Sequence, residues 1–422
     1  MGCHFRTFGW HEVSTSQHAL VIERACWQGE PVVTVVAETR AQAEDALQHI
    51  DVEREELPAV VSMEIALDVD TPVIHPELGD NLCFTRTLDV GNVDEVFATA
   101  DVVAEATFGF GRHTGVTLEP RCQIADYNPG DCRLTVYHSQ QAPHNMMQDL
   151  YCRQFGLSES DVHVICKDVG GSFGIKVHAY PDDFATVGLA MMLERPVKFV
   201  ADRLESFTSD IHARKHRIKG RIAANKAGDI LAFEIDDLTA IGPYSMFPRT
   251  SAIEGNQVVN LVGGPYKHQN YRAHLNVVFQ NKTPTCQYRG VGHPIACAVT
   301  EGLIDLAAQK LQMDPLEFRK RNVIPDDAYP YLGISGIRLE VLSHEQCLRT
   351  IEKMMDYSAL RKEQAELRKQ GIYRGISFAT LIELTNPSPA FYGVGGARIA
   401  SQDGAIVRMD PSGVGFGISW CW

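Results

Sequence analysis

The sequence predicts an α+β fold, and two observations along its 422 residues indicate it. Segments with the two-residue alternation of a β-strand recur along the chain, as in DCRLTVYHS (131–139). Segments whose apolar residues follow helical spacing lie between them, as in IACAVTEGLIDLAAQKLQM (295–313). A chain of this length can form two to four domains with an ample core.

The first folded unit is predicted at residues 20–70. A β-branched run at 32–37 follows a Gly-Glu-Pro turn, which favours a strand. An amphipathic helix is predicted at 40–50, and Pro58 closes a second, edge strand. These elements form a small β-α-β unit, and we expect the proline-containing and acidic segment 71–90 to be a linker.

Two glycine-rich loops lie in the central part of the chain. The first, KDVGGSFGIK (167–176), stands between a strand-like run and a helix that begins at Pro181. The second, YRGVGHP (288–294), opens the helix at 295–313. The backbone N–H groups of a glycine-rich loop that leads into a helix are accessible and can face an anionic or oxo ligand. The first loop lacks the Gly-Lys-Ser/Thr ending of a P-loop, and other glycine clusters lack G-x-G-x-x-G spacing, so neither motif is supported.

Phe173 is the unusual member of the first loop. From the residues alone it is either a plug in the core or a wall beside a planar ligand. A polar strand end, HSQQ (138–141), is a third segment, beside the two glycine loops, that offers polar groups to a ligand. We expect the two loops and this strand end to converge on one site.

Composition excludes several classes of protein. Hydrophobic residues make up 45% and charged residues 22%, as in a soluble globular protein, and the formal net charge is −14. This charge argues against a nucleic-acid partner or an anionic membrane surface, and the basic segment RKHRIKGR (214–221) is interpreted as a solvated strand edge. No apolar run is long enough for a membrane span, and residues 1–20 lack a signal core, so we expect a cytoplasmic protein.

The cysteines do not predict a metal or disulfide framework. There are 11 of them, widely scattered, and none forms a C-x-x-C pair. Disulfide frameworks, zinc sites and iron–sulfur clusters are therefore poorly supported in this chain.

Taken together, the motifs resemble the molybdenum-binding large subunit of the xanthine dehydrogenase, aldehyde oxidase and carbon monoxide dehydrogenase family. The motifs follow in family order over about 20–412: HTGVTLEPRCQIADY, VYHSQQAPH, DVGGSFGIK, RPVKFVADRLESF, YRGVGHPIACAVTEGLIDLAAQKLQMDPLEFRKRNVI and RGISFATLIEL. The resemblance implies the C-terminal part of an α/β hammerhead domain at 20–70 and a first molybdenum-cofactor-binding domain at 91–325. It implies the incomplete beginning of a second such domain at 326–422.

The resemblance also assigns site residues. Those implied to bind the cofactor are Gln140, Gly171, Ser172, Phe173, Gly174 and Arg289. Those implied to line the substrate pocket are Val177, Val291, Phe378 and Ala379. In this family a pterin holds the molybdenum, so no protein metal ligand is expected. The resemblance implies molybdopterin or its cytosine dinucleotide form, with iron–sulfur clusters and FAD only on partner subunits.

The implied reaction is hydroxylation of an electron-poor carbon with oxygen from water, on a small organic substrate. Gly290 stands where the carbon monoxide enzymes carry a copper-linked cysteine, which disfavours that substrate. Val177 and Val291 replace a carboxylate and an aromatic ring of the purine enzymes, so an N-heteroaromatic compound or an aldehyde fits better.

The family's catalytic glutamate and its Gly/Gln-rich cofactor block have no counterpart in the sequence, so no residue is assigned the role of base. The chain is expected to be truncated at both ends relative to the family, or to be a split subunit whose remainder is a separate chain. An inactive fragment and a non-enzymatic assembly subunit are the alternatives.

Overall fold

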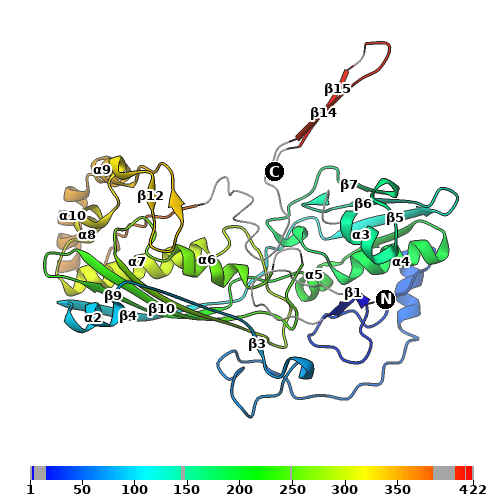
Figure 1. Ribbon diagram of the computed structural model, residues 1–422, viewed down its shortest axis with the longest axis horizontal. Coiled ribbons are helices and arrows are strands. Elements are labelled where there is room, and N and C mark those ends of the chain that lie inside the picture. Colours follow the sequence, from blue (N-terminus) through cyan, green and yellow to red (C-terminus); the bar gives the residue numbers. More distant parts are fainter. Residues whose placement is uncertain are drawn as a thin grey trace.

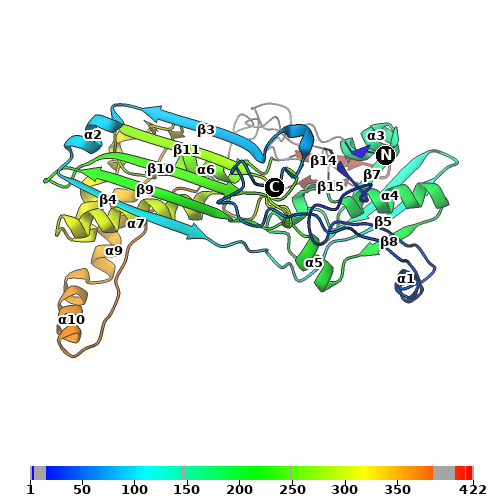
Figure 2. The same ribbon diagram turned by 90° about the horizontal axis from the view of Figure 1, so that it is seen from below.

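The computed structural model describes residues 2–3, 16–143, 148–247, 250–383, 404–413 and 415–420. Two sheets with their helices form two bodies that lie along the longest axis of the molecule (Figures 1 and 2). The larger body contains a five-stranded sheet and the smaller a four-stranded sheet. This architecture confirms the α+β class.

The five-stranded sheet has the order β3-β11-β10-β9-β4. Its neighbours are antiparallel except β10 and β11, which are parallel. The strands are Leu82–Val90 (β3), Val102–Phe110 (β4), His216–Ala224 (β9), Ile230–Ala240 (β10) and Asn270–Val278 (β11). Helices α6 (Ile253–Leu261) and α7 (His293–Lys310) pack against this sheet (Figure 2), as does the short α2 (Val93–Thr99).

The main core lies between this sheet and α7. Ile218 and Ile222 of β9 are fully buried, and so are Val299 and Leu303 of α7. Gly220 stands between the two isoleucines, and a Cβ there would lie 3.0 Å from Leu303 Cδ1. The missing side chain therefore lets α7 approach the strand closely, while each buried aliphatic side chain contributes about 1.5–3 kcal/mol.

The four-stranded sheet has the order β7-β6-β5-β8, with β6 and β7 parallel and the other pairs antiparallel. Its strands are Cys122–Asn128 (β5), Arg133–His138 (β6), Val162–Ile165 (β7) and Val197–Val200 (β8). Its helices are α3 (Gln148–Phe155), α4 (Pro181–Leu193) and α5 (Arg203–Ser209). Helix α4 begins at Pro181 as predicted, and the Asp183 carboxylate caps it by accepting from the Tyr180 amide at 2.8 Å.

The other elements are short or lie toward the two ends of the chain. They are β1 (Gly2–Cys3), β2 (Gln17–His18), α1 (Arg40–Leu47), η1 (Pro76–Leu78), η3 (Glu159–Asp161), η4 (Ile175–Val177), α8 (Pro315–Asn322), η5 (Asp326–Ala328), β12 (Tyr331–Leu332), β13 (Arg338–Leu339), α9 (His344–Met354), α10 (Tyr357–Lys369), β14 (Gly404–Met409) and β15 (Gly415–Trp420). None of the helices in the described ranges has the length and apolar character that crossing a bilayer requires.

The N-terminal region differs from the predicted β-α-β unit. Helix α1 forms, but residues 32–37 and 51–58 are not strands, and the valines of the first run are mostly exposed. A strand needs a neighbour for its backbone hydrogen bonds, and no described segment provides one here. The segment 71–90 is also more than a linker, because β3 lies within it and pairs with β11 along its length.

A buried arginine fixes α8 to the larger body. Arg319 is 0% exposed. Its Nε donates to Glu301 Oε2 of α7 at 2.8 Å, and Nη1 donates to Asp305 Oδ1 at 2.7 Å. Glu301 Oε1 accepts in turn from the hydroxyl of Tyr266 at 2.8 Å and that of Thr380 at 2.6 Å. One buried carboxylate therefore joins α7 and α8 to the segment that contains Thr380.

We expect Arg319→Ala to lower the free energy of unfolding by about 3–5 kcal/mol, because it leaves the buried Glu301 without its cationic partner. The matched control is Arg321→Ala on the same helix, whose pair with Asp229 is 43% and 46% exposed. That change should cost about 1 kcal/mol or less. Urea denaturation of both variants measures the difference, and equal losses would contradict the role given to Arg319.

Candidate cofactor site

The first glycine loop folds back on itself between β7 and η4. Gly171 and Gly174 have φ of 96° and 98°, and Phe173 has φ of 52°, all in the left-handed region. The Ile175 amide donates to the Ser172 carbonyl at 2.8 Å and closes the turn. A Cβ at Gly174 would lie 2.9 Å from the Gln287 carbonyl oxygen. Glycine is therefore required here both by the backbone angle and by the neighbouring chain.

The second glycine loop lies directly against the first. The Arg289 amide donates to the Phe173 carbonyl at 2.8 Å. A Cβ at Gly115 would lie 2.7 Å from Ile175 Cδ1 and 2.8 Å from Tyr288 Cε2, so a third bare position allows the loops to close together. The predicted convergence of the two loops is thus present in the structure.

The strand end after β6 also reaches the first loop, but through Gln141. Gln141 Oε1 accepts from the Gly174 amide at 3.0 Å, and the Gln141 amide donates to the Lys176 carbonyl at 2.9 Å. Gln140, the residue predicted for the site, is 3% exposed. Its Nε2 donates to the His178 carbonyl at 3.3 Å, and its Oε1 accepts the Gln141 amide at 2.7 Å. The structure therefore turns Gln140 toward backbone groups and brings its neighbour to the loop.

Glu119 is a site residue that the sequence does not single out. Its Oε2 accepts from the Gly170 amide at 2.7 Å and from Lys176 Nζ at 2.7 Å, and Lys176 is 1% exposed. Burial raises the pKa of Glu119, but these two hydrogen bonds outweigh it and hold the pKa below its ordinary value. Glu119 lies within the HTGVTLEP motif, yet nothing in the spacing links it to the glycine loop.

Phe173 is a surface-facing member of the loop. It is 37% exposed, and the Arg289 guanidinium carbon lies 5.1 Å from its ring centroid. The interpretation of Phe173 as a side chain buried in the core is therefore wrong. The amides of Ser172 and Phe173 donate to no acceptor in the described part of the chain. Two such donors beside an exposed ring and a guanidinium fit an electron-rich, planar group such as a metal–dithiolene pterin.

The predicted pocket residues are only partly brought together. Val177 is 5% exposed in η4, and Val291 is half-buried in the second loop. Phe378 is 8% exposed and its ring packs edge-on to Tyr357 at 5.2 Å, in a core cluster of the C-terminal helices. Ala379 is exposed beside it, and the Thr380 carbonyl lies 3.9 Å from Cys297 Sγ of α7. The segment therefore passes along α7, while the Phe378 ring points into that cluster.

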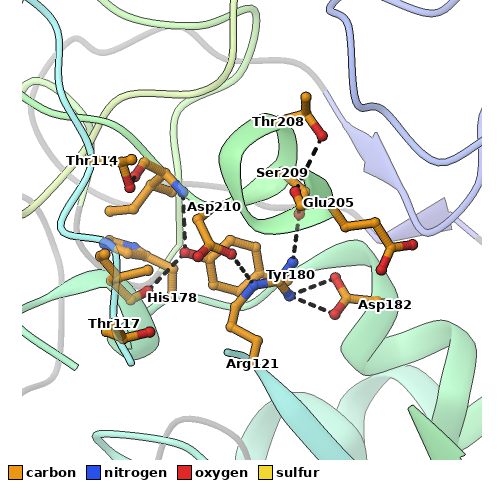
Figure 3. A network of polar contacts seen from close by, with 12 residues as sticks. Thr114, Thr117, Arg121, His178, Tyr180, Asp182, Glu205, Thr208, Ser209 and Asp210 are labelled. Carbon is orange, nitrogen blue, oxygen red and sulfur yellow. Dashed lines mark hydrogen bonds and ion pairs between the residues drawn. The ribbon is translucent and has the colours of Figure 1, made fainter. Parts of the chain in front are cut away.

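A buried arginine holds the exit of the first loop (Figure 3). Arg121 Nε donates to Asp210 Oδ1 at 2.6 Å and Nη1 to Asp182 Oδ1 at 2.7 Å, and the guanidinium carbon lies 3.8 Å from the Tyr180 ring centroid. Burial lowers the pKa of Arg121, but Asp182 and Asp210 raise it well above its ordinary value. The Tyr180 hydroxyl donates to the Ile175 carbonyl at 2.8 Å. The network thus connects β5, α4 and α5 to the loop.

No group of three His, Cys, Asp or Glu side chains in the described ranges is arranged to hold a metal ion. The polar groups at the site are backbone amides, the Gln141 side chain, whose Oε1 accepts from the Gly174 amide, and the Arg289 guanidinium. Such a set can orient a cofactor that carries its own metal ligands.

The chain matches the family model of the molybdopterin cofactor-binding domain over residues 74–323. It is 33% identical to the nicotine 6-hydroxylase large subunit of Paenarthrobacter nicotinovorans, over 91% of this chain and 47% of that relative. It is 30% identical to the carbon monoxide dehydrogenase large chain of Hydrogenophaga pseudoflava, over 93% of this chain and 51% of that relative.

Among solved structures, quinoline 2-oxidoreductase from Pseudomonas putida 86 superposes with a TM-score of 0.91 at 30% identity. The match covers 99% of this chain and 52% of that one. The chain therefore spans about half the length of the relatives that it matches.

We expect Gly174→Ala to disturb the contact between the loops, because its Cβ would meet the Gln287 carbonyl. Gly79→Ala is the matched control, since Gly79 has φ of 86° with nothing within 4 Å of its Cβ position. The control should cost about 1–2 kcal/mol from its left-handed backbone. Gly174→Ala should cost about 1–3 kcal/mol more from overpacking. Urea denaturation measures both, and equal costs would show that the contact tolerates a methyl group.

We expect Glu119→Gln to destabilise the protein by about 1–3 kcal/mol at pH 7, because it leaves the buried Lys176 ammonium without an anionic acceptor. The folded-state pKa of Glu119 lies below the ordinary value of a glutamate, so this stability is present at pH above that ordinary value and is lost as pH falls through the folded pKa. The gap between wild type and variant should therefore be constant above that pH and close in acid. Glu317→Gln, from an exposed pair with Lys320, should show no such pattern in pH-resolved urea denaturation. A gap that persisted in acid would contradict the ion-pair assignment.

Proposed function

The chain belongs to the molybdenum hydroxylase large subunits, and on that premise we propose that it binds molybdopterin at the two converging loops. The observation that carries the proposal is the Arg289–Phe173 hydrogen bond, which places the amide-rich turn of one loop beside the other. In this proposal the first loop presents its backbone to the cofactor at Gly171, Ser172, Phe173 and Gly174. Arg289 of the second loop lies on the other side of the cofactor.

The proposed reaction is hydroxylation of an electron-poor carbon with oxygen from water. When bound, the molybdenum cofactor supplies the oxidation chemistry and accepts the electrons. The part of this chain is to orient the group and to exclude water around it, through fixed amide donors that need no rearrangement during the reaction. In this proposal Gln141, which contacts the Gly174 amide, takes the role that the resemblance implied for Gln140.

An N-heteroaromatic substrate fits best. Val291, half-buried in the second loop, offers an apolar surface, and Val177, which is buried in η4, supplies no carboxylate of the kind that orients purines. Nicotine 6-hydroxylase and quinoline 2-oxidoreductase, two of the relatives, are named for nitrogen heterocycles. An aldehyde is the second candidate, because an aldehyde oxidoreductase of Megalodesulfovibrio gigas is 30% identical over 84% of this chain. Gly290, at the place of the expected copper-linked cysteine, disfavours carbon monoxide.

We propose that this chain acts in the cytoplasm, in a complex with iron–sulfur and FAD subunits that carry the electrons away. The exposed side chains of Val32, Val33 and Val36 are apolar surface that such an assembly could cover. The same exposure also favours the alternative of an assembly subunit or inactive fragment.

The test is co-expression with these partner chains, followed by metal and pterin analysis of the purified complex. We expect about one molybdenum and one pterin per copy of this chain, and release of a cytidine nucleotide on hydrolysis if the dinucleotide form is bound. Turnover is then measured on an N-heteroaromatic compound and an aldehyde. A stable complex without molybdenum would overturn the proposed function.

Gly171→Glu distinguishes an enzyme from a scaffold, because it places a charged side chain in the loop at a φ of 96°. The proposal expects turnover to be lost while the complex still assembles. Gly156→Glu is the control, since its φ of 69° is also positive but no atom lies within 4 Å of its Cβ position. An assembled Gly171→Glu complex with normal turnover would contradict the placement of the cofactor.

A further inference from the structure

Four buried ionisable side chains form a row that leads from the five-stranded sheet to the second glycine loop. Asp237 of β10 accepts from His216 Nδ1 of β9 at 3.0 Å. His216 Nε2 lies 3.7 Å from Glu254 Oε2 of α6. Glu254 Oε1 accepts from Arg214 Nη1, and Glu254 Oε2 accepts the Arg214 amide at 3.0 Å. All four are at most 7% exposed.

The charges in this row alternate. Burial lowers the pKa of His216, but Asp237 and Glu254 raise it to about 9. Burial raises the pKa of Glu254, but His216 and Arg214 lower it to about 2. The row is therefore negative, positive, negative and positive from Asp237 to Arg214, and its net charge is zero. The other polar groups that face it are the Thr239 hydroxyl, 2.8 Å from His216 Nδ1, and Lys282. Burial lowers the pKa of Lys282 well below its ordinary value, and the negative charge of Glu254 acts against that shift.

The positive end of the row reaches the loop. Arg214 Nη2 donates to the Arg289 carbonyl at 2.5 Å. Since the Arg289 amide donates to the Phe173 carbonyl, both main-chain polar groups of Arg289 are occupied, one by each body of the molecule. Arg214 itself has φ of 68°, which turns its side chain from the end of β9 toward the loop.

Helix α6 also abuts this loop. A Cβ at Gly292 would lie 2.5 Å from Gln257 Cβ and 2.9 Å from the Glu254 carbonyl. The helix that supplies Glu254 therefore holds the loop by contact as well as by charge.

We propose that Arg214, anchored by Glu254 and His216, is a positioning residue that sets the orientation of the Arg289 peptide and so the spacing between the two glycine loops. The assignment of those loops as a cofactor site rests on the proposed function. The positioning itself does not, because it concerns hydrogen bonds within this chain. Arginine suits the task because its planar fork serves a carboxylate and a carbonyl at once, which a lysine ammonium cannot do in the same geometry.

The test is amide hydrogen exchange of the full chain, resolved at Arg289 by mass spectrometry. The variant Arg214→Met/Glu254→Gln removes one positive and one negative charge, so it leaves no net buried charge. We expect the Arg289 amide to exchange at least about tenfold faster in this variant, the effect of losing one hydrogen bond from a charged donor. The control Arg221→Met/Glu234→Gln removes one positive and one negative charge from a more exposed pair between β9 and β10, and should change that rate by less than about twofold. Unchanged exchange at Arg289 in the first variant would overturn the proposal.

Arg214→Lys separates positioning from simple stability, because it keeps the charge beside Glu254. We expect its melting temperature to match wild type while exchange at Arg289 stays faster; a return of both to wild-type values would refute the need for the guanidinium. In the assembled complex, Arg214→Lys should lower kcat with KM nearly unchanged. If the complex binds no molybdenum, the proposed function fails, while the exchange result still decides the role of Arg214.

Discussion

The hydrogen bond between the Arg289 amide and the Phe173 carbonyl joins the two halves of the molecule at its site. One partner belongs to the loop that follows β7 of the four-stranded sheet, and the other to the loop that precedes α7 on the five-stranded sheet. A single backbone contact is weak by itself. It keeps a fixed geometry because each loop is also bound to the sheet from which it comes. Glu119 and Gln141 bind the first loop, and Arg214 binds the second.

Both bodies use a buried arginine that is paired with acidic side chains for this purpose, two in the case of Arg121 and one in the case of Arg214. Arg121 is held by Asp182 and Asp210 and reaches the first loop through Tyr180 (Figure 3). Arg214 is held by Glu254 and reaches the second loop directly. Buried ion pairs add little net stability, but they specify one geometry because an unpaired charge in the interior is so unfavourable. The site is therefore rigid where it faces away from solvent, and the exposed ring of Phe173 lies on its open side.

The sequence predicted the class of fold, the helix at α7 and the start of α4, because glycine spacing and amphipathic periods are local signals. The meeting of the glycine loops was expected from their similar character, and spacing alone could not establish it. It missed Glu119, whose contacts with Gly170 and Lys176 depend on tertiary packing alone. The resemblance implied Gln140, whereas the structure brings the side chain of Gln141 to the Gly174 amide. Adjacent glutamines at a strand end are distinguished only by the face that each takes. The strand expected at 32–37 does not form for another reason. Residues with high β propensity form a strand only where a neighbouring strand accepts and donates their backbone hydrogen bonds.

The position of the site across two sheets also bears on the order of events during folding. The loops are joined by residues that are distant in sequence, Phe173 and Arg289, and contacts of that kind form slowly compared with local structure. Glu119 and Arg214 must likewise be in place before the turn around Phe173 has a defined shape. An early folding intermediate therefore lacks the completed pair of glycine loops. A bulky ligand would bind between them in the last step of maturation and would not nucleate folding.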